Sequence, residues 1–226
     1  MPCAGTCWPL ISSLHTAQRP QLQLAIGQVG SGYRFFGAGP TAVPVQGRPS
    51  AGACHIDVAC PQGAAWLTEI SGVGAYSTGG SIFCTGAMLN NTAQDGRNYF
   101  LTSYGCGIRS ANAASVVVYW NYQNTACGGP DVGRGLEFTT GSALRAEYAA
   151  TDFTLLELNV TPAWGVTYLG WERHCDCATS AVSIHHPSGE PKKISFENDP
   201  TQITSYSGNT SPGDGTHLRV VDWDVG

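Results

Sequence analysis

The chain has 226 residues, which is enough for one large β domain or two small ones. Only 12% of the residues are charged, the formal net charge is −5, and no basic run could follow a phosphate backbone, so we expect no nucleic-acid partner. No apolar stretch approaches the ~20 residues that a transmembrane helix needs, so we expect no membrane partner either.

Glycine (29 residues) and proline (13 residues) are abundant, which favours turns and short strands over long helices. The nine cysteines indicate an oxidising compartment, because disulfides are rare in a reducing cytosol. Nine is an odd number, so at least one cysteine lacks a disulfide partner within the chain. The first twenty residues, "MPCAGTCWPLISSLHTAQRP", have no positive n-region and no long apolar run, and we expect the true start to lie upstream.

Residues 1–50 are rich in Gly, Pro and Gln, with "IGQVGSGYRFFGAGP" as a possible hairpin. We interpret them as a pro-segment remnant or poorly ordered tail, and residues 51–226 as the folded domain. From residue 51 onward, short runs rich in β-branched and aromatic residues alternate with turn signals such as "NNTAQDG" and "CGGPDVG". Regularly spaced strands without helical periodicity predict an all-β barrel or sandwich. The predicted strands are Gly80–Leu89, Tyr99–Ser103, Ser115–Tyr122, Ala143–Ala149, Phe153–Asn159, Val166–Trp171, Ala181–His185 and His217–Trp223.

Several separate motifs follow one another along residues 52–221 in a recognisable order. They are "GACHIDVACPQG", "VGAYSTGGSIFCTGAMLNNT", "YFLTSYGCG", "SVVVYWNYQNTAC", "ATDFTLLELN", "GWER", "IHHPSGEPKKIS" and "GTHLRV". In these motifs the chain resembles the bacterial lysyl endopeptidase family of trypsin-like serine proteases. The resemblance implies an all-β, trypsin-like double antiparallel β-barrel, with the second barrel incomplete at the C-terminus of this chain. It also implies secretion and cleavage of a polypeptide substrate by a Ser-His-Asp triad.

The resemblance places the triad carboxylate at Asp152, which precedes the apolar run "FTLLEL". Without the family context, Asp152 is an ordinary turn aspartate before a strand. The family's catalytic histidine would stand next to Cys106, where this chain has Gly105. Glycine cannot accept a proton, and the preceding tyrosine, with an ordinary pKa near ~10, is a poor base at neutral pH.

The family's nucleophilic serine lies in a Gly-x-Ser-Gly segment that follows the strand matching "HLRVVDWDVG", and this chain holds no such segment. We therefore expect a truncated, degenerate family member without catalytic activity. Two alternatives stay open: a pseudoprotease that binds a peptide or partner protein, and an extracellular β-rich module with a zinc site.

The resemblance also implies two disulfides, Cys84–Cys106 and Cys60–Cys127. Cys54 matches a cysteine whose family partner lies beyond Gly226. No pairing is assigned to the remaining cysteines, which are Cys3, Cys7, Cys175 and Cys177.

For the zinc alternative, the candidate ligands lie in "RHCDCATSAVSIHH": His174, Cys175, Cys177 and one of His185 or His186. The Cys-x-Cys spacing is unusual for a structural zinc site, so we favour no metal. No nucleotide-binding glycine pattern is present, and we expect no cofactor. Tyr206 aligns weakly with an aromatic residue that the family places beside the substrate side-chain pocket.

Overall fold

The structure is a computed structural model that describes residues 52, 54–78, 84–129, 137–172, 177–206, 208 and 211–226. Over these residues the fold is all-β, with one short α-helix, α1 (Leu67–Gly72), and a few 3-10 turns. None of the described helices is long and apolar enough to cross a bilayer. The interpretation of residues 1–50 as a tail concerns a part of the chain outside the described residues.

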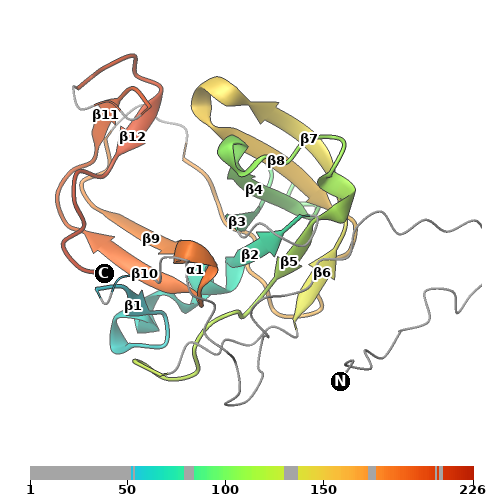
Figure 1. The fold of residues 1–226 in the computed structure, drawn as a ribbon, viewed down its shortest axis with the longest axis horizontal. Helices are drawn as coiled ribbons and strands as arrows, with labels where there is room; N and C mark the ends of the chain where they lie inside the picture. The colour runs from blue at the N-terminus through green and yellow to red at the C-terminus, as the bar shows by residue number, and fades with distance from the viewer. Residues whose placement is uncertain are drawn as a thin grey trace, which may run out of the picture.

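The larger unit is a curled seven-stranded sheet in which every neighbouring pair is antiparallel, in the order β6–β5–β2–β3–β4–β8–β7 (Figure 1). Its strands are β2 (Val73–Ser77), β3 (Cys84–Leu89), β4 (Tyr99–Ser103), β5 (Val117–Tyr119), β6 (Phe138–Thr140), β7 (Ser142–Tyr148) and β8 (Phe153–Leu158).

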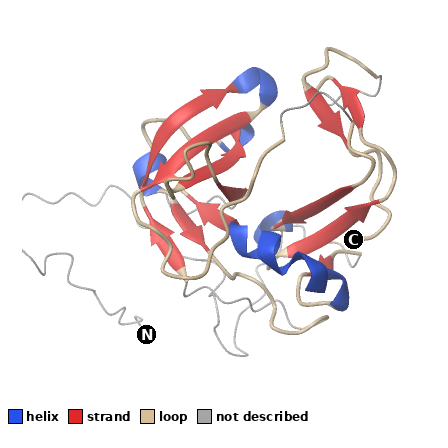
Figure 2. Ribbon diagram, turned by 180° about the vertical axis from the view of Figure 1, so that it is seen from behind, coloured by secondary structure: helices blue, strands red, loops and turns tan. Residues whose placement is uncertain are grey.

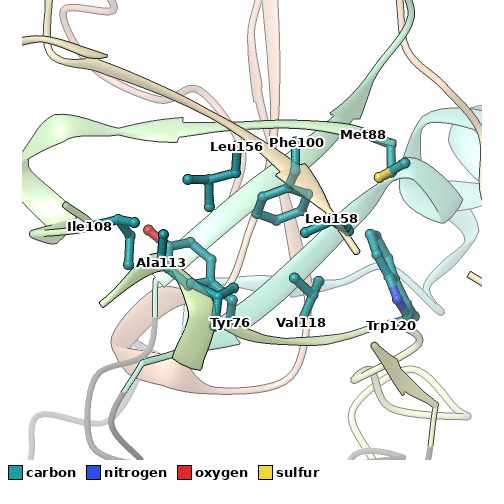
Figure 3. Close-up of a cluster of buried hydrophobic side chains, with 10 residues drawn as sticks. Tyr76, Met88, Phe100, Ile108, Ala113, Val118, Trp120, Leu156 and Leu158 are labelled. Carbon is teal, nitrogen blue, oxygen red and sulfur yellow. The ribbon is translucent and has the colours of Figure 1, made fainter. Parts of the chain in front are cut away.

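Alternation along these strands shows which face of the sheet is buried. In β4 and β8 every second residue is buried and the residues between are partly exposed, so one face of each strand turns inward. Phe100 lies at the centre and makes edge-to-face contacts with Tyr76 and Trp120, at 5.7 and 5.9 Å between ring centroids. Met88 and Leu156 lie beside Phe100 on the neighbouring strands β3 and β8, and Figure 3 shows their side chains in the same cluster. The curled sheet therefore encloses a core of aromatic and aliphatic side chains.

The second unit contains two smaller sheets, which lie beside the first unit in both ribbon views (Figures 1 and 2). One has the order β1–β10–β9 and the other is the hairpin-like pair β11–β12. The strands are β1 (Ile56–Asp57), β9 (Ala181–His185), β10 (Lys193–Glu197), β11 (Gln202–Thr204) and β12 (His217–Arg219). A small core of Val58, Ile70 and Ile194 lies between this sheet and α1.

Two adjacent lysines connect distant segments of the second unit in different ways. The ammonium group of Lys193 forms a buried ion pair with Asp57 at 2.6 Å, and the Asp57 carboxylate also accepts bonds from Asn124 Nδ2 and the Gly128 N–H. Lys192 is completely buried, and its ammonium nitrogen donates to the carbonyl of Ile70 at 2.7 Å. Both contacts join segments more than a hundred residues apart.

Both disulfides implied by the resemblance are present. Cys60–Cys127 has a Cα–Cα distance of 4.4 Å and Cys84–Cys106 one of 6.3 Å. Cys54 and Cys177 are exposed and form no disulfide with a described residue.

The all-β fold predicted from the sequence is confirmed, but the strand at Val166–Trp171 is wrong. This segment is a loop that touches the sheet at one parallel bridge, Leu89↔Leu169, because the chain there crosses from one unit to the other. The strand predicted for His217–Trp223 ends at Arg219. The sequence analysis missed β2, which is buried along its whole length, and the short strands β1, β6, β10 and β11.

Candidate functional site

Asp152 lies directly before β8, where the 3-10 turn Ala149–Thr151 ends. Its backbone is left-handed, with φ 52° and ψ 36°, a conformation that aspartate adopts more readily than most residues. Its carbonyl accepts a hydrogen bond from the Tyr104 N–H at 3.0 Å. This turn brings the Asp152 carboxylate to the turn that follows β4, where Gly105 lies 47 residues earlier in the chain.

The Asp152 carboxylate is oriented by one donor on each oxygen. The Gly105 N–H donates to Oδ1 at 2.7 Å, and the Ser103 hydroxyl donates to Oδ2 at 2.7 Å. Ser103 Oγ also accepts from the Gly105 N–H at 3.0 Å, as the N-cap of the 3-10 turn Tyr104–Cys106. The three residues form a closed polar ring that fixes the direction of the carboxylate.

The turn that carries Gly105 is held on both sides. Ser103 caps its start, and Cys106 at its end is bonded to Cys84 at the start of β3. Gly105 itself is exposed, and its φ is outside the left-handed region. A Cβ atom built there would lie 3.2 Å from Ser103 Oγ and 3.5 Å from Asp152 Oδ1, with no other described residue outside its chain neighbours within 4 Å. The backbone conformation suits a side chain at residue 105, which would start beside the carboxylate once the Ser103 hydroxyl shifts by a few tenths of an ångström.

No described cation neutralises Asp152. The nearest arginine along the turn, Arg109, stacks its guanidinium on the Tyr104 ring at 3.6 Å and lies 3.6 Å from Glu147. Its Nη1 also donates to the carbonyl of Ile108 at 2.6 Å. Asp152 forms no ion pair with any residue in the described part of the chain.

The described histidines all lie away from this carboxylate, and none contacts it. His55 and His185 pack edge to face at 5.6 Å, and burial together with the neighbouring His55 lowers the pKa of His185. His217 contacts Tyr206 at 5.3 Å and Thr216 Oγ1 at 2.7 Å. Among described residues, the site therefore has a carboxylate and no imidazole.

His186 belongs to the same buried region as Lys192. Its ring stacks on Tyr122 with an interplanar angle of 4°, and its Nδ1 lies 2.9 Å from the Glu190 carbonyl oxygen. Burial, with a smaller contribution from the Lys192 charge, lowers the pKa of His186 to about 3. Burial likewise lowers the pKa of Lys192 to about 7. A histidine enclosed in this way cannot reach a substrate.

Tyr206 lines a pocket of about 580 Å³ on the second unit, next to β11 and β12. The other aromatic side chains of the pocket are His217 and Trp223, and Arg219 contributes a positive charge. Tyr206 is 71% exposed, so its ring is available to a ligand. Tyr206 therefore lies in the wall of a pocket. That this pocket binds a substrate side chain stays a prediction.

Only some of the candidate zinc ligands lie in the described part of the chain. His174 and Cys175 lie outside the described residues, whereas Cys177 is exposed and His186 is buried with its Nδ1 beside a carbonyl oxygen. Among described residues, one group of three carboxylates lies within 4.8 Å, formed by Glu197, Asp199 and Asp224. Backbone N–H groups of Asn198 and Asp199 already donate to two of these carboxylates.

Ser103 is the site residue that the sequence analysis missed. It stood inside the quoted motif "YFLTSYGCG", two positions before Gly105, but a serine at a strand end is common and carries no signal by itself. Only the fold shows that its hydroxyl reaches a carboxylate 49 residues away.

Comparison with known proteins relates the chain to a protein family and to a curated relative. The family described as "Lysyl endopeptidase, C-terminal domain" matches residues 49–226. A curated protein named "Lysyl endopeptidase", from Pseudomonas aeruginosa, is 31% identical over 187 residues. The aligned region covers 77% of this chain and 39% of that relative, so the chain spans well under half the length of the relative it matches.

Proposed function

Because the chain belongs to the lysyl endopeptidase family, we propose that it is a trypsin-like serine endopeptidase homologue that does not cleave peptide bonds. The single observation that carries this proposal is the Gly105–Asp152 contact. The carboxylate that would orient a catalytic imidazole is in place, and the residue beside it has no side chain.

The chemistry of the family explains why one missing group is decisive. A serine nucleophile needs an imidazole to take its proton and later to protonate the leaving amine, while the carboxylate only orients and stabilises that imidazole. Asp152 can perform the third role, because its two hydrogen bonds fix its direction. Without an imidazole between it and a serine, Asp152 has nothing to orient. In such enzymes, loss of a triad member leaves only the weak catalysis that binding and oxyanion stabilisation provide.

No described group replaces the missing base. A general base must lie within hydrogen-bond reach of the proton that it removes. His186 is buried, and His55, His185 and His217 contact residues of the second unit, not Asp152. This distribution supports inactivity through Gly105 alone, whatever the rest of the protein contributes.

A second candidate function is the non-catalytic binding of a peptide. The pocket around Tyr206 and Trp223 favours it, since exposed aromatic rings beside a cationic Arg219 can contact both apolar and anionic parts of a peptide. We propose the extracellular space as the site of action, because the two disulfides suit an oxidising compartment.

The test is a cleavage assay on the protein expressed from its complete coding sequence. Lysyl and arginyl amide substrates should be cleaved no faster than buffer alone, and the Gly105→Ala variant should behave the same. Gly105→His restores the missing group and should raise cleavage if a serine segment is present elsewhere in the protein. Cleavage by the Gly105 form at the rate of an ordinary trypsin-like enzyme, with kcat/KM of about 10⁴ M⁻¹s⁻¹ or more, would refute the proposal.

A further inference from the structure

We propose that a second pocket, on the outer face of the seven-stranded sheet, binds the ring of a neutral sugar. The pocket has a volume of about 380 Å³. Its lining residues come from the end of β3, the turn that follows it, the strands β4 and β8, and the loop after β8: Leu89, Asn90, Asn91, Thr92, Tyr99, Leu155 and Trp171. The pocket lies at the opposite end of β4 from the Ser103–Asp152 contact, and the proposal goes beyond the proposed function.

The pocket lies on the face of the sheet that is turned away from the core. Tyr99 and Leu155 occupy partly exposed positions of β4 and β8, whereas the alternate positions of both strands are buried. Leu89 pairs with Tyr99 across β3 and β4, so its side chain lies on the same face. Neighbouring strands therefore provide a largely apolar floor.

Trp171 is positioned beside this floor by the loop that precedes it. The backbone of Leu169 is bonded twice to the end of β3: its N–H donates to the Met88 carbonyl, and its carbonyl accepts from the Asn90 N–H, both at 2.9 Å. Trp171 follows two residues later and is 48% exposed. Its large ring is therefore held at the pocket with about half of its surface available to a ligand.

The pocket also carries neutral hydrogen-bonding groups. Asn90 Oδ1 accepts from the Asn91 N–H at 2.8 Å, which orients the amide and leaves its Nδ2 without a described partner. The hydroxyls of Thr92 and Tyr99 also form no hydrogen bond with a described residue. An amide nitrogen donates, and a hydroxyl both donates and accepts. A ligand that is rich in hydroxyl groups can bond to each of these three groups.

No charged residue lines the pocket in the described part of the chain, and the charges next to Tyr99 and Asn91 are already bonded. Arg97 lies over the Tyr99 ring at 5.3 Å and donates to both carboxylate oxygens of Glu157, each at 3.1 Å. Asp95 accepts from Asn91 Nδ2 and from the Arg97 N–H, at 2.8 and 3.1 Å. An ionic ligand would lose hydration without meeting an opposite charge in the lining, so the pocket favours a neutral ligand.

Two other kinds of neutral ligand suit the pocket less well. A purely apolar ring would cover the Asn90 amide and the hydroxyls of Thr92 and Tyr99 without bonding to them, which costs free energy. An extended peptide binds through its backbone to an unpaired strand edge. Here the end of β3 is paired on both edges, with β4 and with Leu169. A pyranose ring offers an apolar C–H face to Trp171 and hydroxyls to the polar groups.

The experiment is an NMR titration of the isotope-labelled protein with three neutral sugars: methyl β-glucopyranoside, methyl β-galactopyranoside and N-acetylglucosamine. We expect at least one of them to shift the Trp171 indole N–H and the Asn90 side-chain amide saturably, with a dissociation constant of about 1–10 mM. Trp171→Ala should weaken that binding about tenfold or more, measured at the Asn90 amide. Phe138→Ala, which removes an equally exposed ring on β6, should leave it unchanged.

Four competing compounds test the choice of ligand. Glucuronate and glucosamine represent an anionic and a cationic ring, benzyl alcohol an apolar ring, and the tripeptide Ala-Phe-Ala a peptide. Each should bind more weakly than the best neutral sugar at the same two reporter groups. Equal or tighter binding of any of the four would overturn the proposal, and for the tripeptide it would assign the pocket to a peptide. Absence of saturation by all three neutral sugars up to about 100 mM would also overturn it, as would unchanged binding by Trp171→Ala.

The outcome is separate from that of the cleavage assay. Failure of the sugars to bind would leave the inactivity through Gly105 untouched. Efficient peptide cleavage by the Gly105 form would refute the inactivity, while the titration would still report whether the pocket at Trp171 binds a sugar.

Discussion

Replacement of Lys192 by methionine should stabilise the protein at neutral pH. The Lys192 side chain is completely buried, and its ammonium nitrogen has one described acceptor, the carbonyl of Ile70 at 2.7 Å. Burial lowers its pKa from 10.5 to about 7, so the unfolded chain binds a proton between pH 7 and pH 10.5 that the folded chain releases. Stability from this group therefore rises as the pH increases through that window, and below pH 7 the full cost of burying the charge applies.

The size of the effect follows from the shift. Burial of the charged ammonium costs ~5 kcal/mol of unfolding free energy at low pH, of which about 3 kcal/mol is regained between pH 6 and pH 9. Lys192→Met removes this cost and sacrifices one hydrogen bond of about 1 kcal/mol. The variant should therefore be more stable than the parent at pH 6, by a few kcal/mol, and the difference should shrink toward pH 9.

The assay is urea unfolding of both proteins at pH 6, 7, 8 and 9, followed by tryptophan fluorescence. The matched control is the neighbouring lysine: Lys193→Met breaks the buried ion pair with Asp57 and should destabilise the protein by about 3–5 kcal/mol. A Lys192→Met variant that is less stable than the parent at every pH would refute the reasoning, since it would mean that the ammonium group contributes net stability.

Three further predictions concern the core, the site turn and acid stability. Phe100→Ala should cost about 3–5 kcal/mol in a thermal or urea melt, because Phe100 is fully buried between two aromatic rings; a loss below about 1 kcal/mol would contradict this packing. Removal of the Cys84–Cys106 disulfide in the Cys84→Ser/Cys106→Ser variant should lower the free energy of unfolding by about 2–4 kcal/mol and speed amide hydrogen exchange at Gly105. Unchanged exchange would show that Ser103 alone holds the turn. His186, with its pKa lowered to about 3, should cause stability to fall as the pH drops from about 6.5 toward 3, and His186→Gln should flatten that slope; an identical slope in the variant would exclude His186 as the cause.

The sequence predicted the parts of this fold that local chemistry determines. Alternating runs such as the one in β8 correctly predicted strands. The resemblance in the sequence motifs correctly predicted the family and the two disulfides. Strand β2 was not predicted, because a strand that is buried along its whole length shows no alternation of apolar and polar residues. The loop around Leu169 looked like a strand because its apolar residues pack against the sheet without joining it beyond one bridge.

The site was predictable in part for a similar reason. Asp152 and Gly105 were identified through the family motifs, and the structure places the Gly105 N–H 2.7 Å from the Asp152 carboxylate. The second donor, the Ser103 hydroxyl, depends on a contact across 49 residues that no local pattern encodes. The buried charge of Lys192 was equally hidden, because a lysine beside another lysine normally indicates an exposed surface.

The most direct test of the central claim is the pKa of the imidazole introduced by Gly105→His, measured by NMR in the purified chain. If Asp152 is oriented toward residue 105 as its hydrogen bonds indicate, the carboxylate should raise that pKa above its ordinary value near 6.5, by about 1 unit. Adding Asp152→Asn should return it to the ordinary value. An imidazole that titrates identically with Asp152 and with its asparagine variant would contradict the assignment of Asp152 as the partner of residue 105.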